Sequence, residues 1–153
     1  MHKKVIAIGN RIMGDDAIGL SVAEQLEDFL VEAGFEVVLG ETDFEYCLRT
    51  IKKGDFIIIL DAAYSGAEPG TVRYMSIEEA MMRCRRCNSQ HESNLLLWLN
   101  VYGLEVKGAV LAIEIYKIEP NWGLSHAMQE ILPTVCERVK DKIISILGEG
   151  YHA

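Results

Sequence analysis

The 153-residue sequence has no long hydrophobic run and no sign of an export signal. Half of its residues are hydrophobic, but they occur in short runs, whereas a membrane-spanning helix needs about 20 consecutive apolar residues. The first apolar run, 5–8, follows Met1–Lys4 directly and is too short for the core of a secretory signal. We therefore expect a cytoplasmic protein that does not insert into membranes.

The sequence also lacks a surplus of basic residues. Its formal net charge is −8 at pH 7, and nucleic acids select basic surfaces, so we expect no nucleic-acid partner. An acidic surplus is otherwise ordinary, because it keeps a protein in solution. The chain has 4 cysteines, and without an export signal they are expected to stay reduced.

Common catalytic signatures are missing as well. The sequence contains neither the GxSxG turn of serine hydrolases nor the HExxH helix of zinc peptidases. One CxxC occurs, at Cys84 and Cys87, but no second pair of ligands stands at the spacing that a structural zinc ion requires. Its surroundings also differ from those of a thioredoxin-type motif. We interpret these residues as two thiols in a polar, basic loop over 83–90.

What the sequence does show is an alternation of strand and helix patterns. We predict strands over 5–8, 35–39, 56–60, 71–75 and 109–116, and helices over 16–34, 43–53, a short stretch from Ser76, 92–102 and the C-terminal part, which contains Pro133. Continuously apolar strands alternating with helices are typical of a parallel sheet covered on both faces. We therefore predict an α/β fold, a three-layer sandwich with a mostly parallel central sheet, as a single domain over residues 1–153.

The turn between the first strand and the first helix is the most informative segment. It covers Gly9–Gly19 and places Asp15 and Asp16 where a dinucleotide-binding turn would place glycines and backbone N–H groups for a phosphate. Two carboxylates repel phosphate, and they suit either a metal cation or a helix cap. The position of Asp15 favours an N-cap, whereas Asp16 is open to both interpretations.

Two further residues are candidates for the same site. Asp61 directly follows the apolar run 57–60, and parallel strands end at one edge of the sheet, so Asp16 and Asp61 are expected to lie close together. A lone buried carboxylate is costly, so Asp61 needs a partner or solvent. If Asp61 has no functional role, we expect it to cap a helix or a loop. His91 precedes the leucine-rich helix 92–102 and is expected to reach the same edge, although a lone histidine is more often a surface group. Two carboxylates and one imidazole form a ligand set with open positions, which suits catalytic Zn, Ni, Mn or Fe.

Four segments share their order and character with one protein family. They are VIAIGNRIMGDDAIGLSVAEQL (5–26), IIILDAAYSGAEPGTV (57–72), SQHESNLLLWL (89–99) and IEPNWGLSHAM (118–128). Through them the chain resembles the nickel-iron hydrogenase maturation proteases over nearly its whole length. The Cys84–Cys87 loop is not part of that resemblance.

The resemblance implies a cytoplasmic endopeptidase, either aspartyl-type or metal-dependent, that removes the C-terminal extension of a [NiFe] hydrogenase large-subunit precursor after nickel insertion. The family's acidic residue of the opening loop, its aspartate after the central strand and its histidine bind the metal. Carried over to matching positions, these are Asp16, Asp61 and His91. We expect the nickel to be supplied by the precursor, and other divalent ions to substitute in vitro.

The sequence leaves open the role of the bound ion and, with it, two alternative functions. A bound ion can polarise the scissile carbonyl, activate a water, or only fix the geometry while a carboxylate acts as general base. A non-hydrolytic metal sensor or chaperone is an alternative function. Another metal-dependent amidohydrolase, acting on small substrates, is a second alternative.

Overall fold

The computed structural model describes residues 2–84 and 92–149, and its centre is a five-stranded sheet. The strand order is β2-β1-β3-β5-β4. All neighbouring strands pair in parallel except β4, which runs antiparallel to β5. The strands are β1 (Lys3–Ile8), β2 (Phe35–Glu41), β3 (Phe56–Ala63), β4 (Val72–Ser76) and β5 (Lys107–Glu114).

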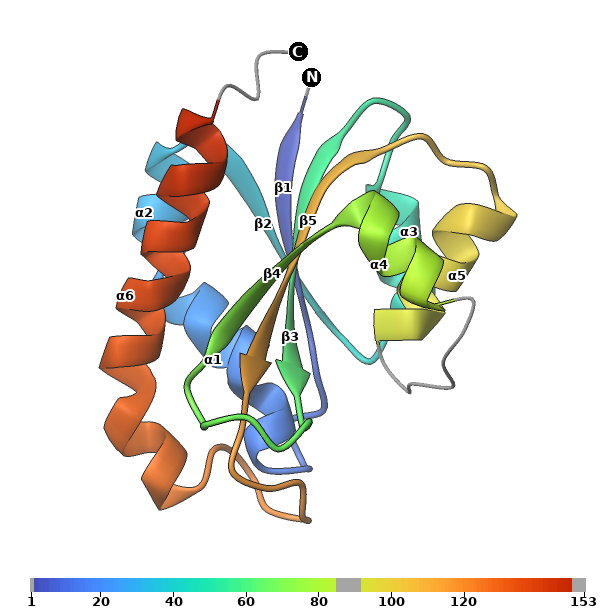
Figure 1. Cartoon of the computed structure of the whole chain (residues 1–153). Coiled ribbons are helices and arrows are strands. Elements are labelled where there is room, and N and C mark those ends of the chain that lie inside the picture. The colour runs from blue at the N-terminus through green and yellow to red at the C-terminus, as the bar shows by residue number, and fades with distance from the viewer. Residues whose placement is uncertain (1, 85–91, 150–153) are drawn as a thin grey trace.

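Helices cover both faces of the sheet, as Figure 1 shows, which confirms the predicted three-layer α/β fold. One face packs against α1 (Ile18–Gln25), α2 (Glu27–Glu32) and α6 (His126–Gly148). The other face packs against α3 (Phe44–Thr50), α4 (Ile77–Cys84) and α5 (Glu92–Val101). Side chains alternate along each strand, so Leu60 of β3 joins the first core while Ile59 joins the second.

The helix predicted over 16–34 is divided into three pieces. A short 3-10 helix, η1 (Asp15–Ala17), leads into α1, and the backbone turns at Leu26 before α2. The backbone hydrogen bond from Leu26 N–H to the Val22 carbonyl, 2.9 Å, holds the two α-helices together across that turn. Gly34 follows the C-cap of α2 with φ +90°, so its predicted role as the residue that ends the helix is confirmed.

The helix starts and ends differ by a few residues from the sequence pattern. The predicted cap of α4 is present, since the Glu79 N–H donates to Ser76 Oγ at 3.1 Å. However, α4 continues through Cys84, so the prediction of a loop was wrong for Arg83 and Cys84. The rest of that loop, with Cys87, lies outside the described residues. Pro133 lies inside α6 and does not begin it.

The antiparallel direction of β4 determines where the following helices start. Because β4 runs back along β5, α4 begins at the amino edge of the sheet, and α5 begins nearer the carboxyl edge (Figure 1). The chain then returns to the amino edge and enters β5. Within 2–84 and 92–149, no helix has the length and apolar character needed to cross a membrane.

Candidate active site at the carboxyl edge of the sheet

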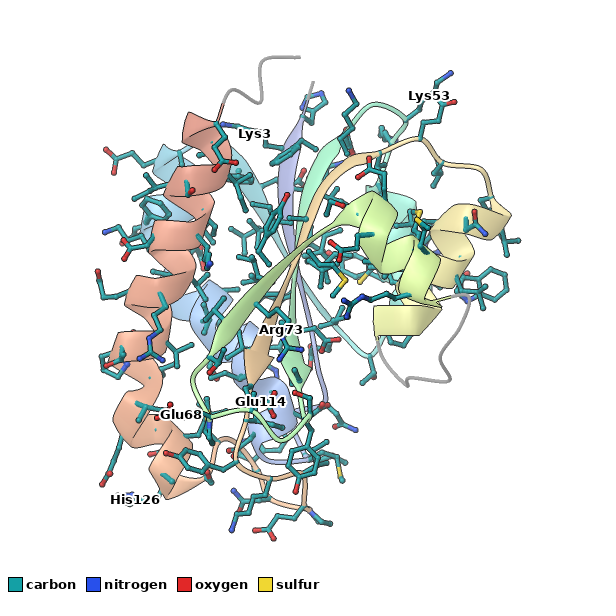
Figure 2. All side chains as sticks on the ribbon, viewed as in Figure 1. Lys3, Lys53, Glu68, Arg73, Glu114 and His126 are labelled. Atoms are coloured by element: carbon teal, nitrogen blue, oxygen red, sulfur yellow. The ribbon has the colours of Figure 1, made fainter. Side chains whose placement is uncertain are left out.

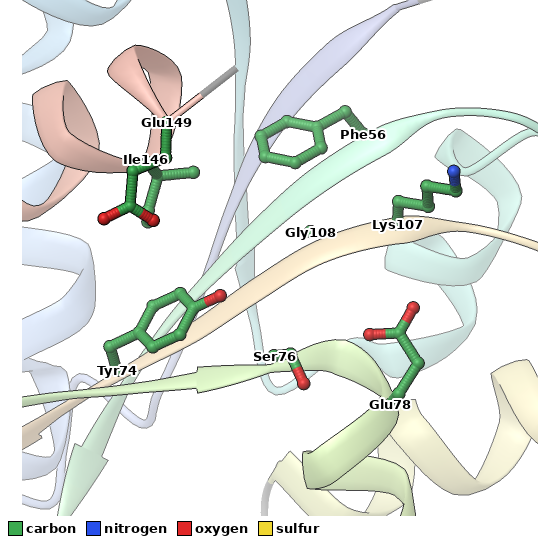
Figure 3. A pocket seen from close by; sticks show the side chains of 8 residues that line it. All are labelled: Phe56, Tyr74, Ser76, Glu78, Lys107, Gly108, Ile146 and Glu149. Atoms are coloured by element: carbon green, nitrogen blue, oxygen red, sulfur yellow. The ribbon is translucent and has the colours of Figure 1, made fainter. Parts of the chain in front are cut away.

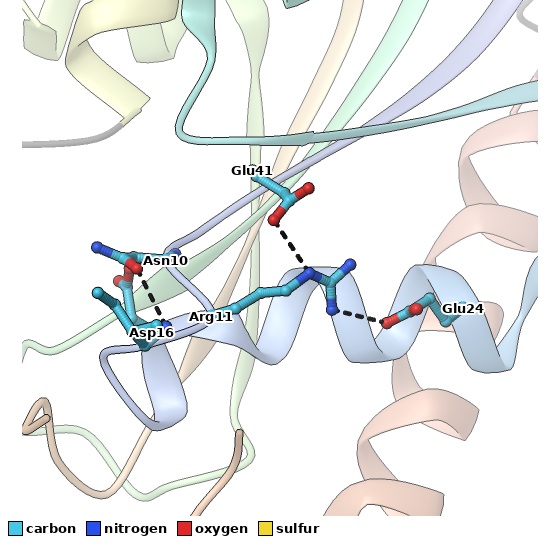
Figure 4. Close-up of polar contacts among 6 residues, drawn as sticks. Asn10, Arg11, Asp16, Glu24 and Glu41 are labelled. Atoms are coloured by element: carbon cyan, nitrogen blue, oxygen red, sulfur yellow. Dashed lines mark hydrogen bonds and ion pairs between the residues drawn. The ribbon is translucent and has the colours of Figure 1, made fainter. Parts of the chain in front are cut away.

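The loop after β1 positions Asp16. The Asn10 side chain accepts the Ile12 N–H at 3.1 Å, and the Met13 N–H donates to the Asn10 carbonyl at 3.1 Å, so the chain turns tightly as it leaves the strand. The Asn10 N–H then donates to Asp16 Oδ2 at 2.8 Å (Figure 4). The loop that contains Asp16 therefore also orients its carboxylate.

Two glycines let this segment lie directly on the sheet. Gly9 has φ +151°, and a Cβ on it would stand 2.3 Å from the carbonyl oxygen of Asp16. A Cβ on Gly19 would stand 2.6 Å from the carbonyl oxygen of Leu60. Backbone therefore packs on backbone at both positions, which explains why η1 and α1 lie against the ends of β1 and β3.

Asp61 lies at the same edge, although β3 does not end there as the sequence pattern suggested. The strand continues to Ala63 because β5 still pairs with it, and Asp61 stands opposite Ala112. The β1 pairing stops one residue earlier, at Leu60. Asp61 Oδ1 accepts the Ala62 N–H at 2.8 Å. Asp61 is thus at the point where the sheet narrows, on the face shared with Ile59.

The structure brings Asp16 and Asp61 to one edge of the sheet. Both are 2% exposed, and the η1 segment that contains Asp16 contacts β3. Their neighbourhood is acidic and largely removed from water. Such surroundings strengthen the attraction to a cation compared with bulk water.

His91, the third predicted ligand, lies outside the described residues. The helix that follows it in the sequence, α5, packs against α3 and α4 on the face toward which Asp61 points. Within the described ranges, no three His, Cys, Asp or Glu side chains are grouped to hold a metal ion. The metal triad of Asp16, Asp61 and His91 therefore stays a prediction.

Asp15 has a different role from the predicted N-cap. The N-cap position of η1 is Gly14, and no side chain caps that helix. Asp15 is buried and instead accepts the backbone N–H of Ser125 at 2.7 Å, the Ser125 hydroxyl at 3.0 Å and the Lys117 N–H at 3.3 Å. It therefore joins the opening loop to the segment before α6. Only one carboxylate of the adjacent pair is left as a candidate for chemistry.

Glu114, at the end of β5, is a buried carboxylate that the sequence interpretation missed. It accepts the Ser65 N–H at 2.8 Å, the Ser65 hydroxyl at 2.6 Å and the Gly66 N–H at 3.3 Å. Figure 2 shows it near the end of the sheet, where it holds the loop after β3. A single charged residue inside the apolar stretch 109–116 was the signal that could have identified it.

A cavity of about 250 Å³ lies at the opposite edge of the sheet (Figure 3). Its lining includes Phe56 and Lys107, where β3 and β5 begin, and Ser76, where the antiparallel β4 ends. It is therefore separated from Asp16 and Asp61 by the length of the strands and is not part of the candidate site.

Comparisons with known proteins agree on one family. The family model described as hydrogenase maturation protease matches residues 20–142. A Methanocaldococcus jannaschii protein, provisionally named as a hydrogenase maturation protease, is 31% identical over 158 residues, covering 97% of this chain and 98% of that protein. The hydrogenase 2 maturation protease of Escherichia coli K12 is 26% identical over 145 residues, covering 91% of this chain and 88% of that protein.

Comparison with solved structures indicates the same family. The solved structure of the hydrogenase maturating endopeptidase HybD from Escherichia coli superposes with a TM-score of 0.76 at 26% identity, covering 95% of this chain and 93% of that one. The matched family segment contains Asp61 and the position of His91, while Asp16 precedes it. The chain belongs to the hydrogenase maturation protease family and is an endopeptidase.

Proposed function

We propose that this peptidase removes the C-terminal extension of a nickel-loaded [NiFe] hydrogenase large-subunit precursor, in the cytoplasm. The observation that carries the proposal is the pair of buried carboxylates, Asp16 and Asp61, at the carboxyl edge of a chain of this family. The reaction is a hydrolysis. Water adds to the scissile carbonyl carbon, the C–N bond breaks, and the departing amine takes up a proton.

We propose further that Asp16, Asp61 and His91 engage the nickel that the precursor presents. Carboxylate oxygens and an imidazole nitrogen are suitable nickel ligands. Backbone N–H groups already orient both carboxylates, through Asn10 for Asp16 and through Ala62 for Asp61. Little side-chain ordering is then needed when the precursor binds.

The residues of the chain divide the chemistry between them. When bound, nickel supplies a Lewis acid beside the scissile carbonyl. One of the two carboxylates then accepts a proton from the attacking water, and burial keeps competing water away from it. The loop 9–14 and the end of β3 hold these groups in place while the precursor provides the bond to be cut.

The ligand set explains why the metal is expected to arrive with the substrate. Two carboxylates and one imidazole without a thiolate leave coordination positions open, and groups of the precursor can fill them. The nickel is therefore part of the substrate in this proposal. Other divalent ions are expected to substitute in vitro.

A direct experiment compares nickel-loaded and nickel-free precursor, each incubated with metal-stripped peptidase, and measures the mass of the large subunit. We expect only the loaded precursor to be shortened. Equal shortening of both would reject nickel recognition and indicate a peptidase that cleaves without the precursor's nickel. No shortening of either by the folded chain, with its cognate precursor, would favour the non-hydrolytic metal-binding alternative.

A further inference from the structure

Large apolar side chains are exposed on the loops that surround the candidate site. Ile12 follows β1, Tyr64 follows β3, and Ile118 and Trp122 follow β5. Trp122 is 76% exposed, more than any other large apolar side chain in the described part of the chain. We call these four residues the apolar rim. They come from the three loops at the carboxyl edge, the edge at which Asp16 and Asp61 lie.

The rim is held by backbone hydrogen bonds between two of these loops. The residues on either side of Trp122 are both fixed: the Asn121 N–H donates to the Ile12 carbonyl at 3.1 Å, and the Gly123 N–H donates to the Arg11 carbonyl at 3.1 Å. Ile118, on the loop after β5, forms a β-bridge with Gly14, which lies on the loop after β1 together with Ile12. Three of the four rim side chains thus project from one hydrogen-bonded layer, so binding a partner there requires little ordering of backbone.

The same layer is connected to the candidate site. Asp15 binds Ser125, three residues after Trp122, and Asp15 is the neighbour of Asp16 in the sequence. Arg11 strengthens the loop from its other side through ion pairs with Glu24 at 3.3 Å and Glu41 at 3.1 Å (Figure 4). The rim and Asp16 are therefore fixed relative to each other by the fold.

We infer that the apolar rim is the surface on which the precursor docks, through an apolar patch that flanks its scissile segment. This inference rests on the proposed function. An endopeptidase must bring a protein chain to the edge that contains Asp16 and Asp61, and the loops that contain the rim leave β1, β3 and β5 at that edge. Aromatic and aliphatic side chains at the centre of an interface carry much of its binding energy, and tryptophan is among the most effective.

Recognition by the rim is apolar rather than electrostatic. The basic residues next to Ile118 and Ile12 in the sequence already have acidic partners: Lys117 pairs with Glu119 at 2.9 Å, and Arg11 pairs with Glu24 and Glu41. The four rim side chains are exposed, and covering them with an apolar partner surface is favourable because it removes apolar area from water. The partner surface that fits is therefore an uncharged, apolar one.

The test measures cleavage against precursor concentration for a rim variant, Ile118→Ser with Trp122→Ala. We expect KM to rise about tenfold or more, with a much smaller effect on kcat, because docking and not chemistry is weakened. Ile144→Ser is the matched control: Ile144 is exposed on the C-terminal half of α6, away from this edge, and its KM should match that of the wild type. The single variant Trp122→Phe keeps an apolar ring and should therefore retain most of the affinity of the wild type for the precursor.

Binding is measured separately in an Asp16→Asn background, by titrating labelled precursor. A folded rim variant with wild-type KM and Kd would overturn the rim proposal while leaving the proposed function intact. A fall in kcat without any change in Kd would overturn it too, because the rim would then act on chemistry. Failure of the wild-type chain to cleave would instead reject the proposed function. A dimer in size-exclusion chromatography that the rim variant converts to a monomer would assign the rim to a second copy of the chain and reject the precursor as its occupant.

Discussion

Ser125 donates both its backbone N–H and its hydroxyl to Asp15, which lies 110 positions earlier in the chain. The same hydroxyl oxygen accepts the Met128 N–H at 3.2 Å and so caps α6. One side chain thus connects the opening loop with the last helix. This relationship makes Asp15 a structural residue, although it is adjacent to the candidate catalytic Asp16.

Replacing Asp15 is therefore expected to destabilise the fold. Asp15→Ala leaves the partly buried N–H groups of Ser125 and Lys117 without their acceptor, which should lower the free energy of unfolding by about 1–3 kcal/mol. Urea unfolding measures the change. Asp43→Ala, which removes the exposed cap of α3, is the control and should cost about 1 kcal/mol. An Asp15→Ala variant as stable as the wild type would contradict this role.

Asp16→Asn should abolish processing of nickel-loaded precursor while the protein stays folded. The amide oxygen can still accept the Asn10 N–H, but a neutral amide is a much poorer ligand for a divalent cation. We expect the thermal midpoint to change little and the mass of the precursor to stay unreduced. Asp28→Asn, an exposed acid on α2, should process normally. Normal processing by Asp16→Asn would exclude it from the reaction.

His91→Ala is expected to abolish processing in the same way, since the imidazole is the proposed nitrogen ligand of the set. Circular dichroism should show an intact fold, because the sequence predicts His91 in or beside a loop, where truncation has a small effect on stability. His126→Ala, at the exposed start of α6, is the matched control. Equal activity of the two variants would leave Asp16 and Asp61 without their proposed third ligand.

Replacing Cys84 and Cys87 together with serine should leave cleavage largely intact. The reason is that the sequence offers no second pair of ligands and no activating base beside them. The measurement is the cleavage rate of the double variant against the wild type, with folding checked by thermal melting. Loss of activity in a folded double variant would show that this segment contributes to catalysis or docking.

The buried ion pair at the amino edge predicts an acid sensitivity. Lys4 Nζ lies 2.7 Å from Asp55 Oδ2, and both side chains are buried. Burial alone raises the pKa of the Asp55 carboxyl, but hydrogen bonds from Lys4 and the Lys52 N–H outweigh it, so the pKa lies below its ordinary value. The stabilisation is complete above the unfolded pKa of about 4 and is lost as pH falls toward the folded pKa.

Thermal melts between pH 7 and pH 3 test this prediction. The wild type should lose stability from about pH 4 downward, because the unfolded chain takes up the proton first. Replacing the pair by Lys4→Met with Asp55→Asn should flatten that part of the curve. Asp28→Asn should not change it, because Asp28 is exposed on α2. An unchanged acid limb in the pair variant would assign the acid sensitivity to other carboxylates.

The sequence predicted the elements that depend on local patterns. The apolar run 57–60 marked the central strand, and the order of strands and helices indicated the covered sheet. The direction of β4 could not be predicted, because a short strand pattern contains no information on which way its partner runs. For the same reason, the sequence could not show that α4 begins at the amino edge of the sheet.

Long-range hydrogen bonds explain the errors at the site. Asp15 has the position of a helix cap in the sequence, and only the folded chain shows that its donors lie at Lys117 and Ser125. Glu114 likewise finds Ser65 across 49 positions. Side-chain partners at such separations follow from the topology and not from residue spacing.

The pairing of the opening loop with the segment around Asn121 and Ser125 has a consequence for biosynthesis. The loop is among the first parts of the chain to leave the ribosome, yet its partners are translated more than a hundred residues later. Until then, the nascent chain lacks the contacts that fix Asp15 and the neighbouring Asp16. The edge that contains the candidate site is therefore completed only after Ser125 has emerged, late in translation.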